Sequence, residues 1–265
     1  MIKALFFDID GTLVSFETHQ IPASTIRALE EAKAQGVKVF IATGRPIPLI
    51  NNLGAIEHLI DGYITTNGAC CIVDGKVIFI NAIPEADCQT LIRISDERNI
   101  PTIFVGEKNL VVYHPDKEVE HIFYDYLHAP RLTEADPREL MCRERITQIT
   151  PFFTEAIEQE VMPLIPGCIS GRWYPAFCDI TAIGSDKGNG IRHIAKHFGF
   201  SIEETMAFGD GGNDISMIKV AGIGVAMGNA NESLKPVADY ITSSVDEDGV
   251  EKAMREFGIM HNPAF

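Results

Sequence analysis

The chain has 265 residues, of which 46% are hydrophobic and 22% are charged, an ordinary composition for a folded α/β protein. Its formal net charge of −15 argues against a nucleic-acid partner, because binding a phosphate backbone needs clustered Lys and Arg. No apolar run is long enough to span a membrane, and the first one meets Asp8 too early for a signal peptide. We therefore expect a cytoplasmic protein without a membrane partner, built as one large core or as one core with a smaller inserted domain.

The first expected element is a short apolar strand that begins at Ala4, runs on to Ile9 and suits burial on both faces of a parallel sheet. Asp8 and Asp10 lie at its carboxyl end. Positions two apart share one face of a strand and lie roughly 6 to 7 Å apart, so a phosphate-sized group could fit between them. A strand that ends in an acidic turn explains this pair of residues equally well, since Asp and Gly commonly mark turns.

Strands and helices are expected to alternate through the first part of the chain. Ser24 can cap a helix with apolar residues at helical spacing, and Gly36 ends it. The elements that follow are a strand over 37–44, a helix after Pro46, a strand over 62–68 and a hairpin around Asp74 and Gly75. This βαβ alternation predicts a parallel sheet.

The pattern changes to α+β in the middle of the chain and then returns. The middle elements are the helices 85–99, 118–128 and 155–165, a strand pair over 102–113, a strand over 146–153 and a strand pair over 168–182. From Ser185 the expected elements are the helices 187–198, 213–220, 232–238 and 249–257 and the strands 205–209, 222–227 and 239–243. We predict one α/β core domain, residues 1–83 and 185–265, into which an α+β domain, residues 84–184, is inserted.

The second strand is followed by Thr43, Gly44, Arg45 and Pro46. In open parallel sheets, ligands bind beyond the carboxyl ends of the strands. This segment offers a hydroxyl, a glycine that lets the backbone approach a ligand, and a helix start whose N–H groups can bind an anion. An ordinary strand-to-helix turn remains an alternative for the segment taken alone.

A third strand end carries the run G-D-G-G-N-D, residues 209–214, which adds Asp210 and Asp214 to the same edge of the sheet. Carboxylates that converge there repel one another unless they are protonated or bound to a cation, and hard oxygen ligands favour Mg²⁺. Asp214 alone could serve the helix macrodipole, whereas Lys187 opposes it at a helix start. A residue that breaks a local rule often marks function, although a solvated lysine is the simpler interpretation of Lys187 alone.

The motifs D-I-D-G-T, T-G-R, a lysine and G-D-G-G-N-D resemble, in type and order, the four motifs of the haloacid dehalogenase superfamily. The inserted segment resembles the type IIB cap of the Cof-like sugar phosphatases. The resemblance implies a Rossmann-like parallel-sheet core with an α+β cap, and a Mg²⁺-dependent phosphatase that hydrolyses hexose and pentose phosphates. It also implies that Asp8 is the nucleophile, which forms an aspartyl phosphate, and that Asp10 is the general acid and base.

The resemblance implies roles for the other motif residues as well. Mg²⁺ would be held by Asp8, by the backbone carbonyl of Asp10 and by Asp210, while Asn213 and Asp214 would orient the metal site and Lys187. Thr43, Lys187 and the N–H groups near Gly44 would stabilise the phosphate oxygens.

Residues that contact the sugar are expected on the cap and on the core. Period-two spacing puts Cys178, Ile180 and Ala182 on one face of a strand and Asp179 on the other, where it could accept hydrogen bonds from sugar hydroxyls. Four further candidates for substrate contact are Arg172 and Trp173 on the preceding strand, and Arg45 and Asn67 on the core side. An ordinary sheet surface is the alternative for each cap residue.

Three other functions stay open from the sequence. They are a sugar phosphomutase, a signalling module that accepts phosphate slowly, and a sugar-phosphate sensor without turnover. We expect a small phosphorylated molecule as the partner and a monomer or weak homo-oligomer as the assembly.

Overall fold

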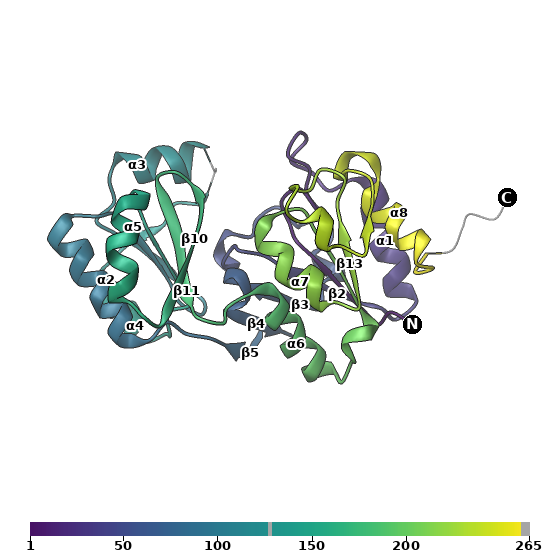
Figure 1. Cartoon of the computed structure of the whole chain (residues 1–265), viewed down its shortest axis with the longest axis horizontal. Helices are drawn as coiled ribbons and strands as arrows, with labels where there is room; N and C mark the ends of the chain where they lie inside the picture. The colour runs from purple at the N-terminus through teal and green to yellow at the C-terminus, as the bar shows by residue number, and fades with distance from the viewer. Residues whose placement is uncertain (127–128, 261–265) are drawn as a thin grey trace. The chain divides into compact units, whose positions relative to one another are not determined.

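The computed structural model describes residues 1–126 and 129–260, with all their side chains except those of Tyr126 and Trp173. The chain forms two compact units (Figure 1): unit 1 comprises residues 1–45, 50–79 and 186–265, and unit 2 comprises residues 46–49 and 80–185. The expected domain boundaries, between residues 83 and 84 and between residues 184 and 185, stay a prediction. Within the described residues, none of the helices has both the length and the apolar character that crossing a membrane requires.

Unit 1 is built on an eight-stranded sheet with the order β14-β13-β12-β1-β2-β3-β4-β5. Neighbouring strands from β14 to β3 run parallel, and β4 is antiparallel to β3. The strands are β1 (Ala4–Phe7), β2 (Lys38–Ala42), β3 (Gly62–Thr65), β4 (Cys70–Val73), β5 (Lys76–Ile80), β12 (Thr205–Gly209), β13 (Ile223–Ala226) and β14 (Tyr240–Ile241). The expected α/β class with a parallel-sheet core is confirmed.

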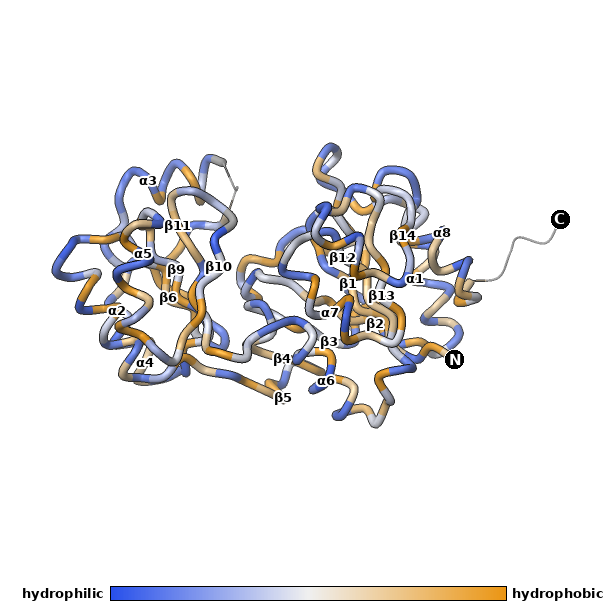
Figure 2. Tube along the Cα trace, viewed as in Figure 1, coloured by the Kyte–Doolittle hydropathy of each residue, from blue (hydrophilic) through white to orange (hydrophobic). Residues whose placement is uncertain are grey.

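Helices cover both faces of this sheet, which is why β1 is an unbroken apolar run. Leu5 and Phe7 pack in the cluster that includes residues of α1 (Ala23–Ala34) and α8 (Gly249–Glu256). Ala4 and Phe6 pack in the cluster that includes residues of α6 (Lys187–Phe198) and α7 (Ile215–Val220). Figure 2 shows hydrophobic residues gathered along the central strands. Burial on both faces fixes the position of the residues that follow β1.

Unit 2 has a six-stranded sheet with the order β10-β11-β9-β6-β7-β8. Its strands are β6 (Thr102–Val105), β7 (Leu110–Tyr113), β8 (Thr133–Glu134), β9 (Gln148–Pro151), β10 (Cys168–Tyr174) and β11 (Phe177–Ala182). Its helices are α2 (Glu85–Arg98), α3 (Lys117–Val119), which continues as a π-helix over Glu120–Tyr126, α4 (Pro137–Met141) and α5 (Glu155–Val161).

The two faces of β11 in unit 2 differ in the way that the alternation of its residues predicts. Cys178, Ile180 and Ala182 pack in one apolar cluster with residues of α2 and α5. Phe177 belongs to a second cluster, on the side of α3 and the π-helical segment. Asp179 therefore lies on the face opposite the α2 and α5 helices, as expected from its position.

Some expected elements are wrong or shorter. The helix after Pro46 is replaced by isolated 3₁₀ turns over Ile47–Leu49 and Glu57–Leu59, because Pro48 lacks a backbone donor and Asn and Gly follow it. The expected helix 232–238 is only a 3₁₀ turn at Lys235–Val237, which contains a proline. Sequence reasoning missed β8 and α4, and the last two residues of the expected helix 118–128 lie outside the described residues.

The carboxylate of Asp61, the residue before β3, links this strand to α1 and β2. Asp61 accepts hydrogen bonds from Lys33 Nζ at 2.6 Å, Lys38 Nζ at 2.9 Å and the Val39 N–H at 2.9 Å. Burial raises the pKa of Asp61, but these hydrogen bonds outweigh burial, so the pKa is lowered overall. A lowered carboxyl pKa stabilises the fold above the unfolded-state pKa, and the stabilisation is lost as the pH falls through the folded-state pKa.

We expect Asp61→Asn to lower the free energy of unfolding by about 1 to 3 kcal/mol at pH 7, because hydrogen bonds to a charged group are lost. The difference from wild type should shrink below about pH 4, where the unfolded carboxyl also gains its proton. Urea denaturation at several pH values measures this, with the exposed Asp246→Asn as the control. Equal midpoints for Asp61→Asn and wild type at pH 7 would contradict the expectation.

Candidate active site

Four segments of unit 1 meet at the edge where the parallel strands end. They are the residues after β1, the loop after β2, the turn after β3 and the loop after β12. The first residue of α6, Lys187, joins them. This edge is the place where open parallel sheets bind ligands.

Lys187 is the centre of the site. Its side chain is fully buried, and its Nζ lies 2.6 Å from Asp8 Oδ1 and 2.6 Å from Asp214 Oδ1. Burial lowers the pKa of Lys187, but the charges of Asp214 and Asp8 outweigh it and raise the pKa overall. Lys187 is therefore a fixed positive charge and not the solvated lysine of the simpler interpretation.

Asp214 fixes the loop that follows β12. Its Oδ1 accepts from Lys187, and its Oδ2 accepts from the backbone N–H groups of Asp210 at 2.9 Å and Gly211 at 2.8 Å. Both carboxylate oxygens are thus engaged by the protein. This bonding suits the expected role of Asp214 in orienting Lys187 and the loop.

Asp8, Asp210 and Asp214 form a carboxylate cluster whose ligand oxygens all lie within 4.8 Å of one another. Burial, and then the nearby Asp214, raise the pKa of Asp210 to about 7. Burial raises the pKa of Asp8 as well, against the opposing effect of Lys187. The raised pKa values mean that the nearby positive charge does not fully offset the cost of burying these carboxylates. A divalent cation bound by the carboxylate oxygens would supply the missing positive charge. The donor set therefore fits such a cation.

Asp10 lies in a separate charge pair. The Arg45 guanidinium donates from Nε to Asp10 Oδ2 at 2.9 Å and from Nη2 to Asp10 Oδ1 at 2.8 Å. The Asp10 side chain is therefore not part of the carboxylate cluster, and its expected metal contact through the backbone carbonyl stays a prediction. Arg45, expected as a substrate contact, holds Asp10 in place.

The loop after β2 brings Thr43 and Gly44 to the same edge. Thr43 is buried, and its Oγ1 accepts from the Arg45 N–H at 3.1 Å. A Cβ on Gly44 would lie 3.1 Å from Asn67 Oδ1, so only glycine fits there without displacing the amide. Asn67 Oδ1 also accepts from Asn213 Nδ2 at 3.0 Å.

Sequence reasoning missed two site residues. Thr12 donates from Oγ1 to Asp210 Oδ1 at 3.0 Å, and Asn229 donates from Nδ2 to the Gly11 carbonyl at 2.8 Å. Thr12 belongs to the D-I-D-G-T motif, which could have revealed it. Nothing in the local sequence marks Asn229, because its partner lies 218 residues away.

Unit 2 holds the remaining sequence candidates. Asp179 Oδ1 accepts from Gln148 Nε2 at 2.9 Å and from Thr150 Oγ1 at 2.7 Å. Trp173 is part of β10, but its side chain lies outside the described residues.

Arg172 is committed to contacts inside unit 2, which argues against the expected substrate contact. Its Nη2 lies 2.6 Å from Glu158 Oε2, and the guanidinium also donates to the backbone carbonyls of Phe153, Pro175 and Phe177. These bonds clamp the turn between β10 and β11.

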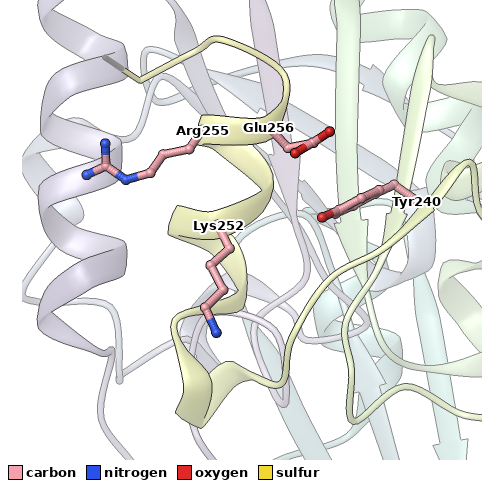
Figure 3. Close-up of a pocket in the computed structure, with 4 residues that line it drawn as sticks. All are labelled: Tyr240, Lys252, Arg255 and Glu256. Carbon is pink, nitrogen blue, oxygen red and sulfur yellow. The ribbon is translucent and has the colours of Figure 1, made fainter. Parts of the chain in front are cut away.

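A hollow of about 530 Å³ lies elsewhere in unit 1, lined by Tyr240, Lys252, Arg255 and Glu256 (Figure 3). Lys252 donates to Ser243 Oγ at 3.0 Å, and Arg255 is paired with Glu251 at 2.7 Å. Its cations are therefore engaged by neighbours. Among the described residues that line the hollow, none forms a group comparable to the carboxylate cluster beside Lys187.

All four segments of the site lie within the part of the chain that a known family matches. The family model of the haloacid dehalogenase-like hydrolases matches residues 5–254. The chain belongs to this family. The expected superfamily is confirmed, and the protein is a hydrolase.

Three similar proteins illustrate this membership of the haloacid dehalogenase family. The structure of the HAD subclass IIB sugar phosphatase BT4131 is 55% identical, with a TM-score of 0.88, and the match covers 97% of this chain and 100% of that one. BT1666 from Bacteroides thetaiotaomicron, a phosphatase of the same superfamily, is 39% identical, with a TM-score of 0.87 and coverage of 98% and 96%. A putative phosphatase of Bacillus subtilis, YkrA, is 35% identical over 97% of this chain and 98% of its own length.

We expect Lys187→Met to lower the free energy of unfolding by about 3 to 5 kcal/mol, because Asp8 and Asp214 lose their buried counter-charge. Chemical denaturation measures this. Lys196→Met, an exposed position on the same helix, should change stability by less than about 0.5 kcal/mol. Equal stabilities of the two variants would mean that the buried ion pairs do not hold the site together.

Proposed function

We propose that this protein is a Mg²⁺-dependent phosphatase that hydrolyses hexose and pentose phosphates through an aspartyl phosphate on Asp8. The observation that carries the proposal is the position of Asp8, at the end of β1, 2.6 Å from a fully buried lysine and within the carboxylate cluster. The similarity to a sugar phosphatase of subclass IIB supports the substrate class.

The first half-reaction transfers the phosphoryl group to Asp8. Asp8 Oδ1 is held by Lys187, so Oδ2 is the oxygen that attacks phosphorus in line. The bond between phosphorus and the sugar oxygen breaks, and Asp10 donates its proton to that oxygen. Lys187 keeps Asp8 oriented and reduces its repulsion with the phosphate.

In the second half-reaction water hydrolyses the aspartyl phosphate. Asp10, now a carboxylate, accepts a proton from the attacking water, and inorganic phosphate leaves with Asp8 restored. The two hydrogen bonds from Arg45 orient the Asp10 carboxylate for this step.

The loop after β2 would stabilise the negative charge on the transferred phosphoryl group, and a bound cation would add to this stabilisation. The Thr43 hydroxyl accepts from the Arg45 N–H, which leaves its own proton to donate to a phosphate oxygen. Asp8, Asp210 and the Asp10 carbonyl would hold Mg²⁺, whose positive charge would offset the repulsion between a carboxylate and a phosphate dianion. Asn213 and Asp214 orient this part of the site.

Unit 2 would serve as the cap that selects the sugar, with Asp179 as the candidate for the sugar hydroxyls. Its carboxylate is supported by Gln148 and Thr150, which gives it a fixed orientation. The internal bonds of Arg172 leave it a role in shaping the turn between β10 and β11.

The proposal predicts steady phosphate release from glucose 6-phosphate and other hexose and pentose phosphates when Mg²⁺ is present. Release should continue over many turnovers and disappear in Asp8→Asn and after chelation of the metal. A phosphate assay measures this. Interconversion of hexose 1-phosphate and 6-phosphate without release would identify a mutase, and labelling that stops at one phosphate per chain would identify a slow phosphate acceptor.

Asp10→Asn should slow turnover by roughly two to four decades, because the asparagine amide can neither donate a proton to the leaving oxygen nor accept one from water. Mg²⁺ binding should persist, since the expected metal contact of Asp10 is its backbone carbonyl. Steady-state kinetics and a Mg²⁺ titration of the melting temperature test the two statements. Unchanged turnover in this variant would remove Asp10 from the mechanism.

A further inference from the structure

The turn that follows β3 has an unusual backbone. Thr66, Asn67 and Gly68 adopt positive φ values of 48°, 51° and 91° in succession. The left-handed region costs a residue with a side chain roughly 1 to 2 kcal/mol, and such strain persists only where the surroundings enforce it. The Thr66 hydroxyl is also buried without a hydrogen-bond partner. The fold therefore tolerates several costs to keep this turn.

The backbone of the turn holds the loop after β2. The Asn67 N–H donates to the Thr43 carbonyl at 3.1 Å, and the Thr66 N–H donates to the Arg45 carbonyl at 3.3 Å. These two bonds flank Gly44, against which the Asn67 amide packs.

The Asn67 side chain reaches the loop after β12. Its Oδ1 accepts from Asn213 Nδ2 at 3.0 Å, although the two residues are 146 positions apart in the chain. This bond links the turn after β3, whose backbone holds the loop of Thr43, to the loop that carries the carboxylates of Asp210 and Asp214.

Gly68 completes the contacts of the turn. A Cβ on Gly68 would lie only 2.0 Å from the Asp186 carbonyl oxygen, so only glycine allows this approach. Asp186 caps α6 by accepting from the Asn189 N–H at 2.8 Å, and it directly precedes Lys187. The turn thus touches the loop after β2, the start of α6 and the loop after β12.

We propose that Thr66–Gly68 is a positioning element, in which Asn67 is a positioning residue that sets Thr43 and Gly44 relative to the loop of Asn213. Asn67 acts through these neighbours and does not read the sugar. The kinetic test of this inference rests on the proposed function, because it needs the protein to release phosphate. Displacement of a phosphate-binding loop by about 1 Å can cost roughly 100-fold in rate.

Asn67→Gly is the variant to make, because glycine keeps the left-handed backbone while it removes the amide. We expect the kcat of Asn67→Gly to be roughly 10- to 100-fold below that of wild type, with little change in KM and the same factor for glucose 6-phosphate and p-nitrophenyl phosphate. A loss confined to glucose 6-phosphate, or one seen mainly in KM, would overturn the proposal, because a sugar contact would give that result.

Asn99→Gly is the matched control. Asn99 also has a left-handed backbone, with φ of 50°, but it ends α2 in unit 2. Its kcat should equal that of wild type. An equal loss in both variants would mean that the effect comes from added chain flexibility, and would overturn the role of the Asn67 amide.

A double-mutant cycle with Asn213→Ala tests the link between the loops. Asn67→Gly should cost much less in kcat when Asn213 is already alanine, since one contact carries both effects. Fully additive losses would contradict the link.

Hydrogen exchange separates this inference from the proposed function. The amides of residues 43–45 should exchange faster in Asn67→Gly than in wild type or Asn99→Gly, whether or not the protein releases phosphate. Unchanged exchange of these amides would overturn the proposed positioning role of Asn67. Absence of phosphate release from wild type overturns the proposed function and leaves the exchange result to decide the inference.

Discussion

The fully buried Lys187 is the constraint on which the rest of the site depends. A buried ammonium is costly unless it is paired and hydrogen-bonded, and Lys187 meets both conditions only because Asp8 and Asp214 each lie 2.6 Å away. Asp8 directly follows β1 and Asp214 lies in the loop after β12, and these two strands are adjacent in the sheet. Parallel pairing, not local sequence, therefore makes the buried charge tolerable.

Close packing of helices supports the same arrangement. Gly188, the next residue of α6, lies so close to the Ser216 backbone that a Cβ would collide with it, and its N–H donates to Ser216 Oγ at 3.1 Å. Helices α6 and α7 thus approach closely beside the site. Lys187 is placed by a sheet edge on one side and by a helix contact on the other.

The site divides its charges into two groups with different tasks. Asp8, Asp210 and Asp214 share one lysine, so their negative charge exceeds the positive charge nearby and suits a cation. Asp10 instead has its own partner in Arg45, which orients the carboxylate without drawing it into the cluster. Two aspartates only two residues apart can therefore have distinct roles in the proposed reaction.

The sequence by itself determined the features that depend on short-range pattern. The apolar run of β1, the carboxylates at its end and the run after β12 predicted the parallel sheet and its acidic edge, because strand period and turn residues are local properties. The opposite faces of β11 followed from the same period of two. The motifs also predicted the family that the comparison confirmed.

Only the tertiary structure decided which side chains form hydrogen bonds or ion pairs, and with which partners. Arg45 binds Asp10, Asn67 meets Asn213 and Arg172 binds Glu158, and none of these pairs is visible in local pattern. The helix expected after Pro46 was wrong. Its apolar residues fit helical spacing, but Pro48 lacks a backbone donor for the hydrogen bonds of a helix. A sequence specifies which groups are available, whereas packing of distant segments decides which of them remain free to bind a substrate.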